Sequence, residues 1–557
     1  MMNRKTILSF GAAVALLANA GLAAAQPPNP GTGTSFGRVM NVGSGPAAVV
    51  VQYIDGNGNV AATRNVSSLA QYGATTISPS AGDVTPALPS GWSGSVIASS
   101  DQPLVGLTYI NWTGGGGGYG FKQDATGLVA DDKHSADYNA TTAPSDNLFF
   151  PSVARRPEEA GKVYVQNTNP PGGASATAYY YFYDRNGVAF GGNPVIRTIP
   201  AGAQVTLDLF DLTANPELNN PYFTNAPETG WLGSIYVTAT QPIAGVAIHT
   251  WFYGSFAYTG KPRSSASTNV LFPKVVRRCL STQGCVNAAS STEPNFTDST
   301  GVVCANTSET QPASITITFT NRAGTVESTY SDTILPLSSK GYNTRFGANL
   351  PVAQRDLIRG LDQTSPPGTS STPNFLGSAQ VTSSQPLVCI AKQLYDKDAA
   401  AIPPGSPASE DPKTRQSLGY TGINLSDAKT EIFLPVAWRI NAQPTCGFWR
   451  YTGLIVQNAG TSNANVTVRA YNNAGTLLNT WNDPTPLTPL TPRGYNTRFD
   501  AGSGYGTDSA VIAALGTNFD GVLRLTSTQP LVAVAENWQN CNSGFSPMTD
   551  SNITELN

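Results

Sequence analysis

The sequence predicts an all-β protein that contains four tandem copies of one antiparallel β-sandwich. The main observation is a stretch that begins with glycine, contains Gln-Pro, and recurs at residues 94–105, 233–244, 377–388 and 521–532. In each copy the second and fourth residues after the glycine are apolar, which is the alternation of a strand with one buried face. Proline cannot donate a hydrogen bond within a sheet, so we expect Gln-Pro to end one strand and to begin the next. Four such copies indicate four tandem units of one fold.

Three shorter signals accompany each copy. A strand leads into an asparagine at Asn41, Asn167, Asn306 and Asn458. A β-rich run then ends in Asp or Asn, with glycine three residues later, at Asp55, Asp184, Asn321 and Asn472. Asp or Asn caps the backbone of a turn, and the glycine adopts the positive φ that completes a hairpin. An aromatic residue, which we expect in the core or at a strand end, stands two places before the signature glycine: Trp92, Trp231, Phe375 and Phe519.

Each unit therefore contains about seven short strands with closely spaced turns and no convincing amphipathic helix, which is typical of an immunoglobulin-like antiparallel β-sandwich. A barrel is the less favoured alternative. We place the sandwiches at residues 26–120, 145–256, 268–397 and 430–557. The stretches 121–144, 257–267 and 398–429 are rich in Pro, Gly, Ser and Asp, so we expect linkers there. Rigid junctions that contain proline favour an elongated molecule.

The composition and the N-terminus indicate an exported protein. Of the 557 residues only 12% are charged, and the formal net charge of -3 gives no reason to expect nucleic acid or an anionic membrane surface. Residues 1–25 have a positive start, an apolar run and the small residues Ala23 to Ala25, as in a cleaved signal peptide. A retained anchor is the alternative, and no later run is long and apolar enough to span a bilayer. We expect secretion to the extracellular surface of a bacterium.

All six cysteines lie in the second half of the chain and fit an oxidising compartment. We predict three disulfides, Cys446–Cys541, Cys304–Cys389 and Cys279–Cys285. Cys304 and Cys389 occupy strand positions that hold Val456 and Ala533 in the next unit, which suggests a bridge across the sandwich. Six cysteines allow about 15 pairings, so the other combinations stay open until peptides are mapped without reduction.

No pattern of catalytic or metal-binding residues appears. Of the two histidines, His134 lies in a polar linker and His249 ends a strand in the second unit alone, so both are more simply incidental. The adjacent acids, Asp131-Asp132, Glu158-Glu159 and Glu410-Asp411, lie in polar loops where such pairs are usually solvated. Asp55 to Asn59 resembles the start of a calcium loop, but Val66 stands where that loop needs an acid, and the hairpin interpretation is simpler. We therefore expect no catalytic residues, no metal site and no cofactor, although a calcium ion at a junction between units stays open.

Two features of the sequence could involve carbohydrate, namely glycan acceptors and aromatic side chains that could bind sugar. Eight Asn-x-Ser/Thr sites are permissible glycan acceptors in an exported chain, namely Asn65, Asn111, Asn139, Asn295, Asn306, Asn424, Asn465 and Asn552. Unmodified asparagine is the simpler interpretation of each. Aromatic side chains found in one unit only could stack on a polysaccharide, namely Trp112, Trp251 to Tyr253, Trp449, Trp481 and Trp538.

The motifs resemble a tandem immunoglobulin-like repeat of large exported surface proteins of filamentous bacteria. The matching residues are the apolar-Pro start at Leu434-Pro435, the Val-Gln-Asn at Val456 to Asn458, the Tyr-Asp hairpin at Tyr183-Asp184 and the signature from Gly377 to Pro386. The resemblance covers the last three units well and implies a structural or adhesive role without catalytic residues. Its motifs specify the fold sharply and the function poorly.

We therefore expect a non-enzymatic exported structural protein that builds or decorates an extracellular layer, sheath or filament. Its partners would be further copies or other cell-surface proteins. Sandwiches with open edge strands can join by strand addition, and the segment from Gln26 to Ser35 could supply the added strand. The alternative is an adhesin that binds surface polysaccharide. A secreted hydrolase would need clustered acids, which the sequence does not show.

Overall fold

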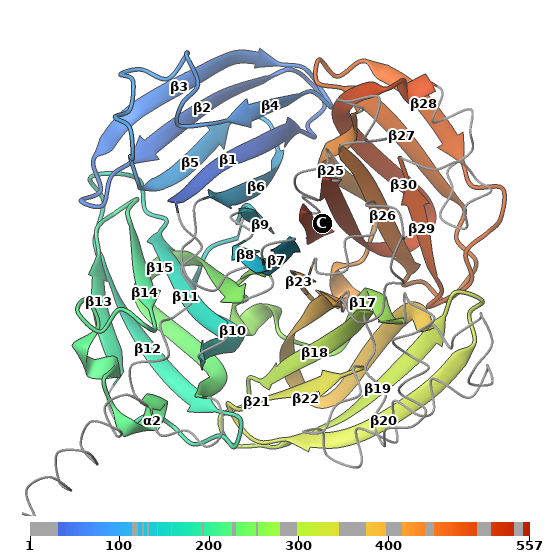
Figure 1. Ribbon diagram of the computed structural model, residues 1–557. Helices are drawn as coiled ribbons and strands as arrows, with labels where there is room; N and C mark the ends of the chain where they lie inside the picture. Colours follow the sequence, from blue (N-terminus) through green and yellow to red (C-terminus); the bar gives the residue numbers. More distant parts are fainter. Residues whose placement is uncertain are drawn as a thin grey trace, which may run out of the picture.

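The computed structural model confirms an all-β protein with several antiparallel sheets (Figure 1). It describes residues 32–113, 121–124, 127–130, 133–141, 143–156, 159–191, 194–224, 230–251, 254–278, 298–344, 375–396, 415–440, 450–497, 514–539 and 550–556. Within these ranges, no helix has the length and apolar character needed to cross a membrane.

One strand arrangement occurs in three copies, and a related arrangement that is divided into two main sheets precedes them. We call the four arrangements units 1 to 4. Unit 1 contains β1 (Thr32–Asn41), β2 (Ala47–Ile54), β3 (Val60–Leu69), β4 (Ala74–Ile77), β5 (Ser95–Ser100), β6 (Leu104–Thr113), β7 (Phe121–Asp124), β8 (Gly127–Ala130) and β9 (Lys133–Asn139). Unit 2 contains β10 (Ser145–Arg156), β11 (Glu159–Asn167), β12 (Ala176–Asp184), β13 (Val195–Ile199), β14 (Gln204–Asp208), β15 (Trp231–Trp251) and β16 (Gly254–Thr259), with the short helices η1 (Pro216–Leu218) and α2 (Pro221–Thr224).

Unit 3 follows the short helix η2 (Arg263–Ser265). It contains β17 (Ser267–Arg278), β18 (Asp298–Asn306), β19 (Ala313–Asn321), β20 (Val326–Ile334), β21 (Ser339–Asn343), β22 (Phe375–Asp396), β23 (Arg415–Thr421) and β24 (Ile423–Asn424). After η5 (Leu425–Asp427), unit 4 contains β25 (Lys429–Ile440), β26 (Arg450–Asn458), β27 (Val466–Asn472), β28 (Leu477–Asn482), β29 (Pro492–Asn496), β30 (Asn518–Gln539) and β31 (Asp550–Leu556). The order β13-β12-β15-β10-β11-β14 of unit 2 recurs as β20-β19-β22-β17-β18-β21 and as β28-β27-β30-β25-β26-β29.

The Gln-Pro signature marks the point where one long strand changes partners. In unit 2, β15 pairs with β12 and with most of β10 before Gln241. From Ile243 onward it pairs with β11 and β16, and Ser145 of β10 also pairs with Ile243. One strand thus contributes to both layers of the sandwich and forms its corner. The two strands expected at this signature are separate in unit 1, as β5 and β6, but they are continuous in the other three units.

The aromatic residue before the signature glycine belongs to the core of its unit. The Trp231 side chain is 1% exposed and packs with Phe182 and Phe223. A Cβ on Gly233 would lie 2.7 Å from the Trp231 ring, so only glycine lets the indole fold back over the strand. The same close approach recurs in the other three units, which explains the Trp/Phe-x-Gly spacing.

The repeated asparagine is a buried clamp. Asn167 is fully buried, and its amide group donates to the carbonyl oxygens of Ala174 at 2.9 Å and Ile199 at 3.1 Å. Its side-chain oxygen accepts a hydrogen bond from the backbone amide of Asn169. Equivalent bonds form around Asn41, Asn306 and Asn458. Because an unpaired buried amide is costly, only asparagine satisfies this site.

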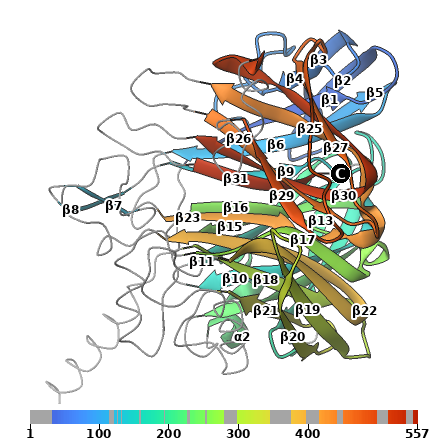
Figure 2. The ribbon, with the colours of Figure 1, turned by 90° about the vertical axis from the view of Figure 1, so that its right-hand side faces the viewer.

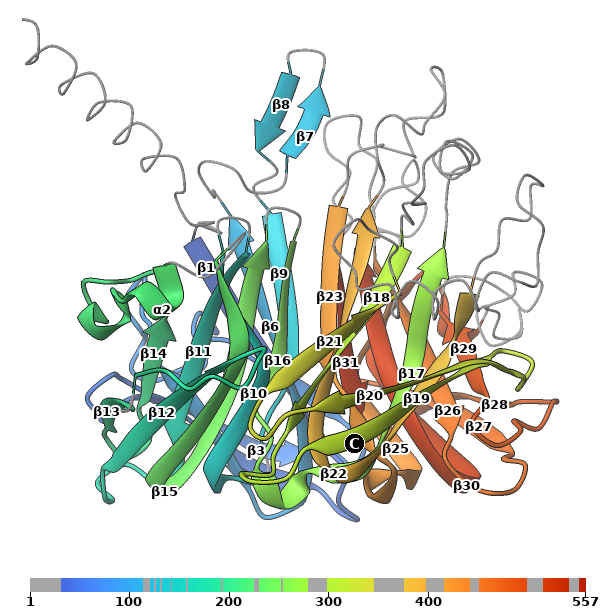
Figure 3. The ribbon, with the colours of Figure 1, turned by 90° about the horizontal axis from the view of Figure 1, so that it is seen from below.

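The four units close into a ring (Figure 1), which Figure 2 shows from the side, and this corrects the expectation of an elongated molecule. Strands β9, β16, β23 and β31 stand around the centre, and each contacts the next, with β31 returning to β9. The stretches expected as linkers therefore contain strands: β9 pairs with β6, β16 with β15 and β23 with β22. The β7–β8 hairpin projects from one face of the ring (Figure 3).

Candidate functional site: the junctions between units

The tip of each predicted hairpin docks on the following unit. Glycine in the tip approaches a turn of the next unit at Gly58, Gly187 and Gly324, and Gly475 of unit 4 approaches Gln71 and Gly73 of unit 1 in the same way. The hairpins themselves form as predicted, since Asp184 Oδ1 accepts the backbone amides of Asn186 and Val188 at 2.8 Å. Docking of unit 4 on unit 1 closes the cycle.

The receiving turn contains a residue in the left-handed region. Tyr72, Leu337 and Leu490 have φ of 59°, 56° and 59°, and Gly202 occupies the matching place in unit 2. The serine that follows the signature glycine donates to the carbonyl oxygen of this residue, with Ser234 Oγ 3.0 Å from Leu337 O and Ser378 Oγ 2.9 Å from Leu490 O. Ser95 does the same toward Gly202.

The closing junction replaces this hydrogen bond with an apolar contact. Unit 4 has Val522 in place of the serine, and Val522 is buried in a cluster with Met40 and Tyr72 of unit 1. Arg38 of unit 1 adds an ion pair with Asp520, at 2.5 Å. Units 4 and 1 therefore meet through a contact that the other three junctions do not share.

The junction between units 2 and 3 holds a buried charged cluster. Lys392 Nζ of unit 3 lies 2.8 Å from Glu159 Oε1 of unit 2, and the same oxygen is 2.7 Å from His249 Nδ1. The other ring nitrogen of His249 lies 2.6 Å from the carbonyl oxygen of Ser152. The His249 ring is fully buried and stacks on Phe256 at 4.6 Å.

Burial and pairing act against each other in this cluster. Burial disfavours the charged carboxylate, but Lys392 and His249 outweigh it and hold the pKa of Glu159 below its ordinary value. Burial, together with Lys392, lowers the pKa of His249, and burial lowers the pKa of Lys392. The expectation that Glu159 is a solvated loop acid is therefore wrong, because the residue begins β11 inside a junction.

The equivalent position differs at each junction. The place of Lys392 in the repeat is held by Glu536 in unit 4, which pairs with Lys274 of unit 3. In unit 1 it is held by Tyr109, which accepts a hydrogen bond from Asn537 and packs on Trp438. Ile248 holds the place in unit 2, in an apolar cluster with Trp112 and Ala136 of unit 1. Charge, hydrogen bonding and apolar packing thus distinguish neighbouring units, which favours one order around the ring.

No catalytic constellation accompanies these contacts in the part of the chain that the structure describes. Within it, no three His, Cys, Asp or Glu side chains gather as metal ligands. A small cavity inside unit 4 is lined largely by apolar side chains such as Leu454, Val468 and Leu523. Tyr495, a titratable side chain on its wall, donates a hydrogen bond to Asp483 Oδ2 at 2.8 Å, and burial raises the pKa of Tyr495.

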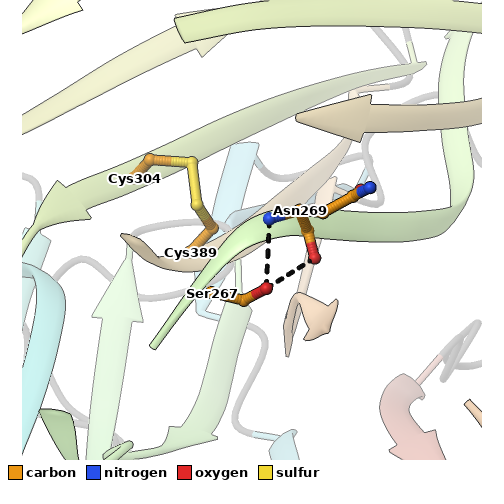
Figure 4. The surroundings of a disulfide bond; sticks show 4 residues. All are labelled: Ser267, Asn269, Cys304 and Cys389. Atoms are coloured by element: carbon orange, nitrogen blue, oxygen red, sulfur yellow. Dashed lines mark hydrogen bonds between the residues drawn. A yellow bond between two sulfur atoms is a disulfide. The ribbon is translucent and has the colours of Figure 1, made fainter. Parts of the chain in front are cut away.

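One predicted disulfide is present. Cys304 and Cys389 are bonded and fully buried (Figure 4). They face each other in the register of β18 and β22, so the bridge joins neighbouring strands rather than crossing the sandwich as expected. The other four cysteines, Cys279, Cys285, Cys446 and Cys541, lie outside the described residues.

The predicted glycan acceptors have different surroundings. Asn65 and Asn465 are exposed, whereas Asn111 and Asn139 are half-buried. Asn306 is fully buried with its amide group bonded to two carbonyl oxygens, so a glycan there is incompatible with the fold. Asn424 is 9% exposed and donates to Ser265 O and to Asp427. Asn295 and the side chain of Asn552 lie outside the described residues.

The proposed assembly strand is already used within unit 1. Residues Thr32 to Ser35 belong to β1 and pair on one side with β6, from Thr113 to Ile110, whereas β4 pairs with β1 only from Gly37 onward. Gln26 lies outside the described residues. Trp112 is 8% exposed, and Trp481 packs edge-on against Tyr495, so neither forms an open platform for sugar. Trp449 and the side chains of Trp251 and Trp538 are not described.

Comparison with known proteins adds no family. No protein-family model matches the chain, and no curated protein does. Among solved structures, an Anabaena sensory rhodopsin transducer matches 19% of this chain over 97% of its own length, at 15% identity and a TM-score of 0.14. A structure described as Thermotoga maritima 1070 matches 22% of this chain over 96% of its own, at 14% identity and a TM-score of 0.16. Likeness at this level carries no argument about function.

Proposed function

We propose that the chain is a non-enzymatic exported structural protein, in which four immunoglobulin-like sandwiches form one ring that builds or decorates an extracellular layer, sheath or filament. Residues 1–25 direct its export. Its partners are further copies of the ring or other surface proteins. The low content of charged residues, 12%, and the exposed acceptors Asn65 and Asn465 suit a glycosylated outer surface.

The observation that carries this proposal is the docking of unit 4 on unit 1. The backbone amide of Ala74 donates to the carbonyl oxygen of Asn473 at 3.0 Å, and the apolar cluster around Val522 surrounds this bond. A repeat protein that stays open leaves a free docking face at each end and can add further repeats there. Here both end faces are covered, so the chain forms a discrete particle of fixed size. Rings of this kind join through their rims or faces.

The junctions support a mechanical role. Their buried ionisable groups pair with one another across unit boundaries, as Lys392 does with Glu159 and Lys274 with Glu536. Such pairs are costly to break, because each leaves an uncompensated buried charge. These two ion pairs therefore hold neighbouring units together.

Immunogold electron microscopy of intact native cells tests the proposal. An antibody against the ring should label the outside of the cell in a continuous layer or along filaments, and a strain whose chain lacks residues 1–25 should show no external label. Label confined to the cell interior in the native strain would refute export. A deletion strain with an unchanged outer layer would refute the structural role.

A further inference from the structure

Within the described residues, strand β20 is an open edge of unit 3 on the rim of the ring (Figure 1). It is the terminal strand of its sheet, with β19 on one side. It spans nine residues and includes the exposed side chain of Val326, which is 52% accessible. Open edges can pair with another strand, and natural proteins usually shorten or cover them.

The backbone of β20 directs its free groups outward at alternate residues. The amide of Ser314 in β19 donates to Ser384 Oγ at 2.9 Å, on the side away from β20. Ser314 faces Thr333, so this is a non-hydrogen-bonded pair and the Thr333 amide points out of the sheet. That amide is capped by Asp332 Oδ1 at 2.7 Å. By alternation the amide and carbonyl groups of Thr329 and Ser331 also point outward, and both side chains are exposed.

The corresponding edges of the other units are shorter or covered. In unit 1, Thr63 of β3 exchanges backbone hydrogen bonds with Thr85. Strand β13 has five residues, and Arg197 bonds the carbonyl oxygen of Ile196. Strand β28 has six residues, and the amide of Thr480 is capped by Asn479. Strands β4, β14, β21 and β29 have five residues or fewer. The outward groups of Thr333 are also covered, by Asp332 and by Lys340 Nζ at 3.5 Å. Among the described edges of units 2 to 4, β20 is the longest, and the outward backbone groups of Thr329 and Ser331 have no such cover within the described residues.

The sequence of β20 is complementary to itself in the antiparallel direction. Pairing two copies about Tyr330 places Val326 opposite Ile334, Thr329 opposite Ser331, and tyrosine opposite tyrosine. The two acids, Glu327 and Asp332, then face Thr333 and Ser328, so no like charges oppose each other. The outward groups of Thr329 and Ser331 fall in hydrogen-bonded pairs, and Tyr330 falls in the closer, non-hydrogen-bonded pair.

We propose that two rings join through antiparallel pairing of β20 with β20 of a second copy, which makes one continuous sheet across both chains. The contact is isologous, so it forms a closed dimer rather than an open chain. Main-chain hydrogen bonds supply the attraction, and the pattern centred on Tyr330 sets the register. The biological meaning of this dimer rests on the proposed structural role, but its existence does not.

Sedimentation velocity of the chain without residues 1–25 over a concentration series tests the proposal. The wild-type chain should show a reversible dimer. Ser331→Pro removes an outward amide and leaves the backbone hydrogen bonds to β19 in place, although it loses the bond between Ser331 Oγ and Thr316 Oγ1 at 3.1 Å. It should raise the dimer dissociation constant at least about tenfold. Asn482→Pro is the matched control, because Asn482 holds the same place in β28, paired with Thr467 as Ser331 is with Thr316. It should leave dimerisation unchanged.

A second variant covers the case in which Ser331→Pro does not fold. Thr329→Lys with Ser331→Lys changes two exposed side chains and loses one exposed hydrogen bond, between Ser331 Oγ and Thr316 Oγ1. It places lysines opposite lysines in the dimer, so it should be monomeric and should still fold, with a melting temperature close to that of the wild type. Tyr330→Cys should form a crosslink between two chains at that position on oxidation, and Thr329→Cys should not. A wild-type chain that is monomeric throughout, a dimer that survives the lysine variant, or equal loss in Asn482→Pro would each overturn the proposal. None of these results bears on the immunogold experiment, so failure of the dimer can be told apart from failure of the proposed function.

Discussion

The backbone amide of Ala74 donates a hydrogen bond to the carbonyl oxygen of Asn473, although the two residues lie in the first and the last unit. The bond forms because the hairpin tip of unit 4 reaches the same kind of turn that receives the tip of every other unit. A local turn motif therefore has a long-range use. It fixes the angle between neighbouring units, and four equal steps return the chain to its start.

Ring closure predicts that Gly475→Ala lowers the unfolding free energy. Gly475 has φ of 82°, and a Cβ there would clash with the carbonyl oxygen of Gln71. We expect a loss of unfolding free energy of about 1 kcal/mol from the backbone and a further loss from separation of units 4 and 1. Gly172→Ala is the control, because Gly172 has φ of 83° and no neighbour within 4 Å of the added atom. Equal melting temperatures for the two variants would contradict the docking contact.

The buried cluster between units 2 and 3 predicts strong coupling between Glu159 and Lys392. Glu159→Gln leaves Lys392 buried without its counter-charge and should cost about 3–5 kcal/mol in urea unfolding. Adding Lys392→Met to that variant should recover much of the loss, since neither charge is then left unpaired. The double-mutant cycle measures this coupling. Additive losses would show that the two side chains do not interact.

The same cluster predicts that stability falls as the pH falls. The pKa of His249 is lower in the folded chain than in the unfolded chain, where it is about 6.5. The unfolded chain therefore binds the extra proton, and the unfolding free energy decreases as the pH drops below about 6.5. Glu159 has the same sign at lower pH, because its folded pKa is also depressed and its stabilising charge is lost on acidification. The unfolding free energy, measured by urea titration at several pH values between neutral and acid, should fall less steeply with decreasing pH for His249→Phe than for the wild type. An equal dependence of unfolding free energy on pH in the wild type and in His249→Phe would contradict a role for His249 in acid destabilisation.

The disulfide joins two strands that the sheet already pairs. Cys304→Val with Cys389→Ala installs the residues that unit 4 carries at the same places, Val456 and Ala533, which pair in the same register. We expect the ring to form and the unfolding free energy to fall by about 2–4 kcal/mol. Loss of the folded state, seen by circular dichroism, would show that the bridge is required rather than additive.

Burial predicts which acceptors can carry glycans. In a host that glycosylates Asn-x-Ser/Thr, Asn65 and Asn465 should be occupied because their side chains are exposed. Asn306 should stay unmodified in folded protein, since its amide donates to Gln311 O at 2.7 Å and Ile334 O at 3.2 Å. Glycopeptide mapping reads all three sites at once. A glycan on Asn306 in folded protein would contradict the two buried hydrogen bonds of its amide group.

The strands and hairpins could be predicted because their causes are local. Asp184 caps its own turn, and Gly233 makes room for an indole two residues away. The ring could not, because the partner of each hairpin tip lies in the next unit. The receiving turns also gave no signal, since Tyr72, Leu337 and Leu490 adopt positive φ without being glycine.

The junction residues were missed for a similar reason. Glu159 reads as a polar loop residue beside Glu158, and only the fold shows that it meets Lys392 of another unit. The available signal was that one repeat position holds Tyr109, Ile248, Lys392 and Glu536 in the four units. A position that changes from apolar to basic to acidic between copies of one fold is more consistent with a contact that differs in each copy than with a shared core site.

Small-angle X-ray scattering of the chain without residues 1–25 tests the closed ring most directly, with Gly475→Ala measured beside it at the same concentrations. The ring predicts a compact particle whose maximum dimension is far below that of four sandwiches end to end, and a variant that expands when the contact between units 4 and 1 is weakened. A rod-like profile for the wild-type chain would contradict the account.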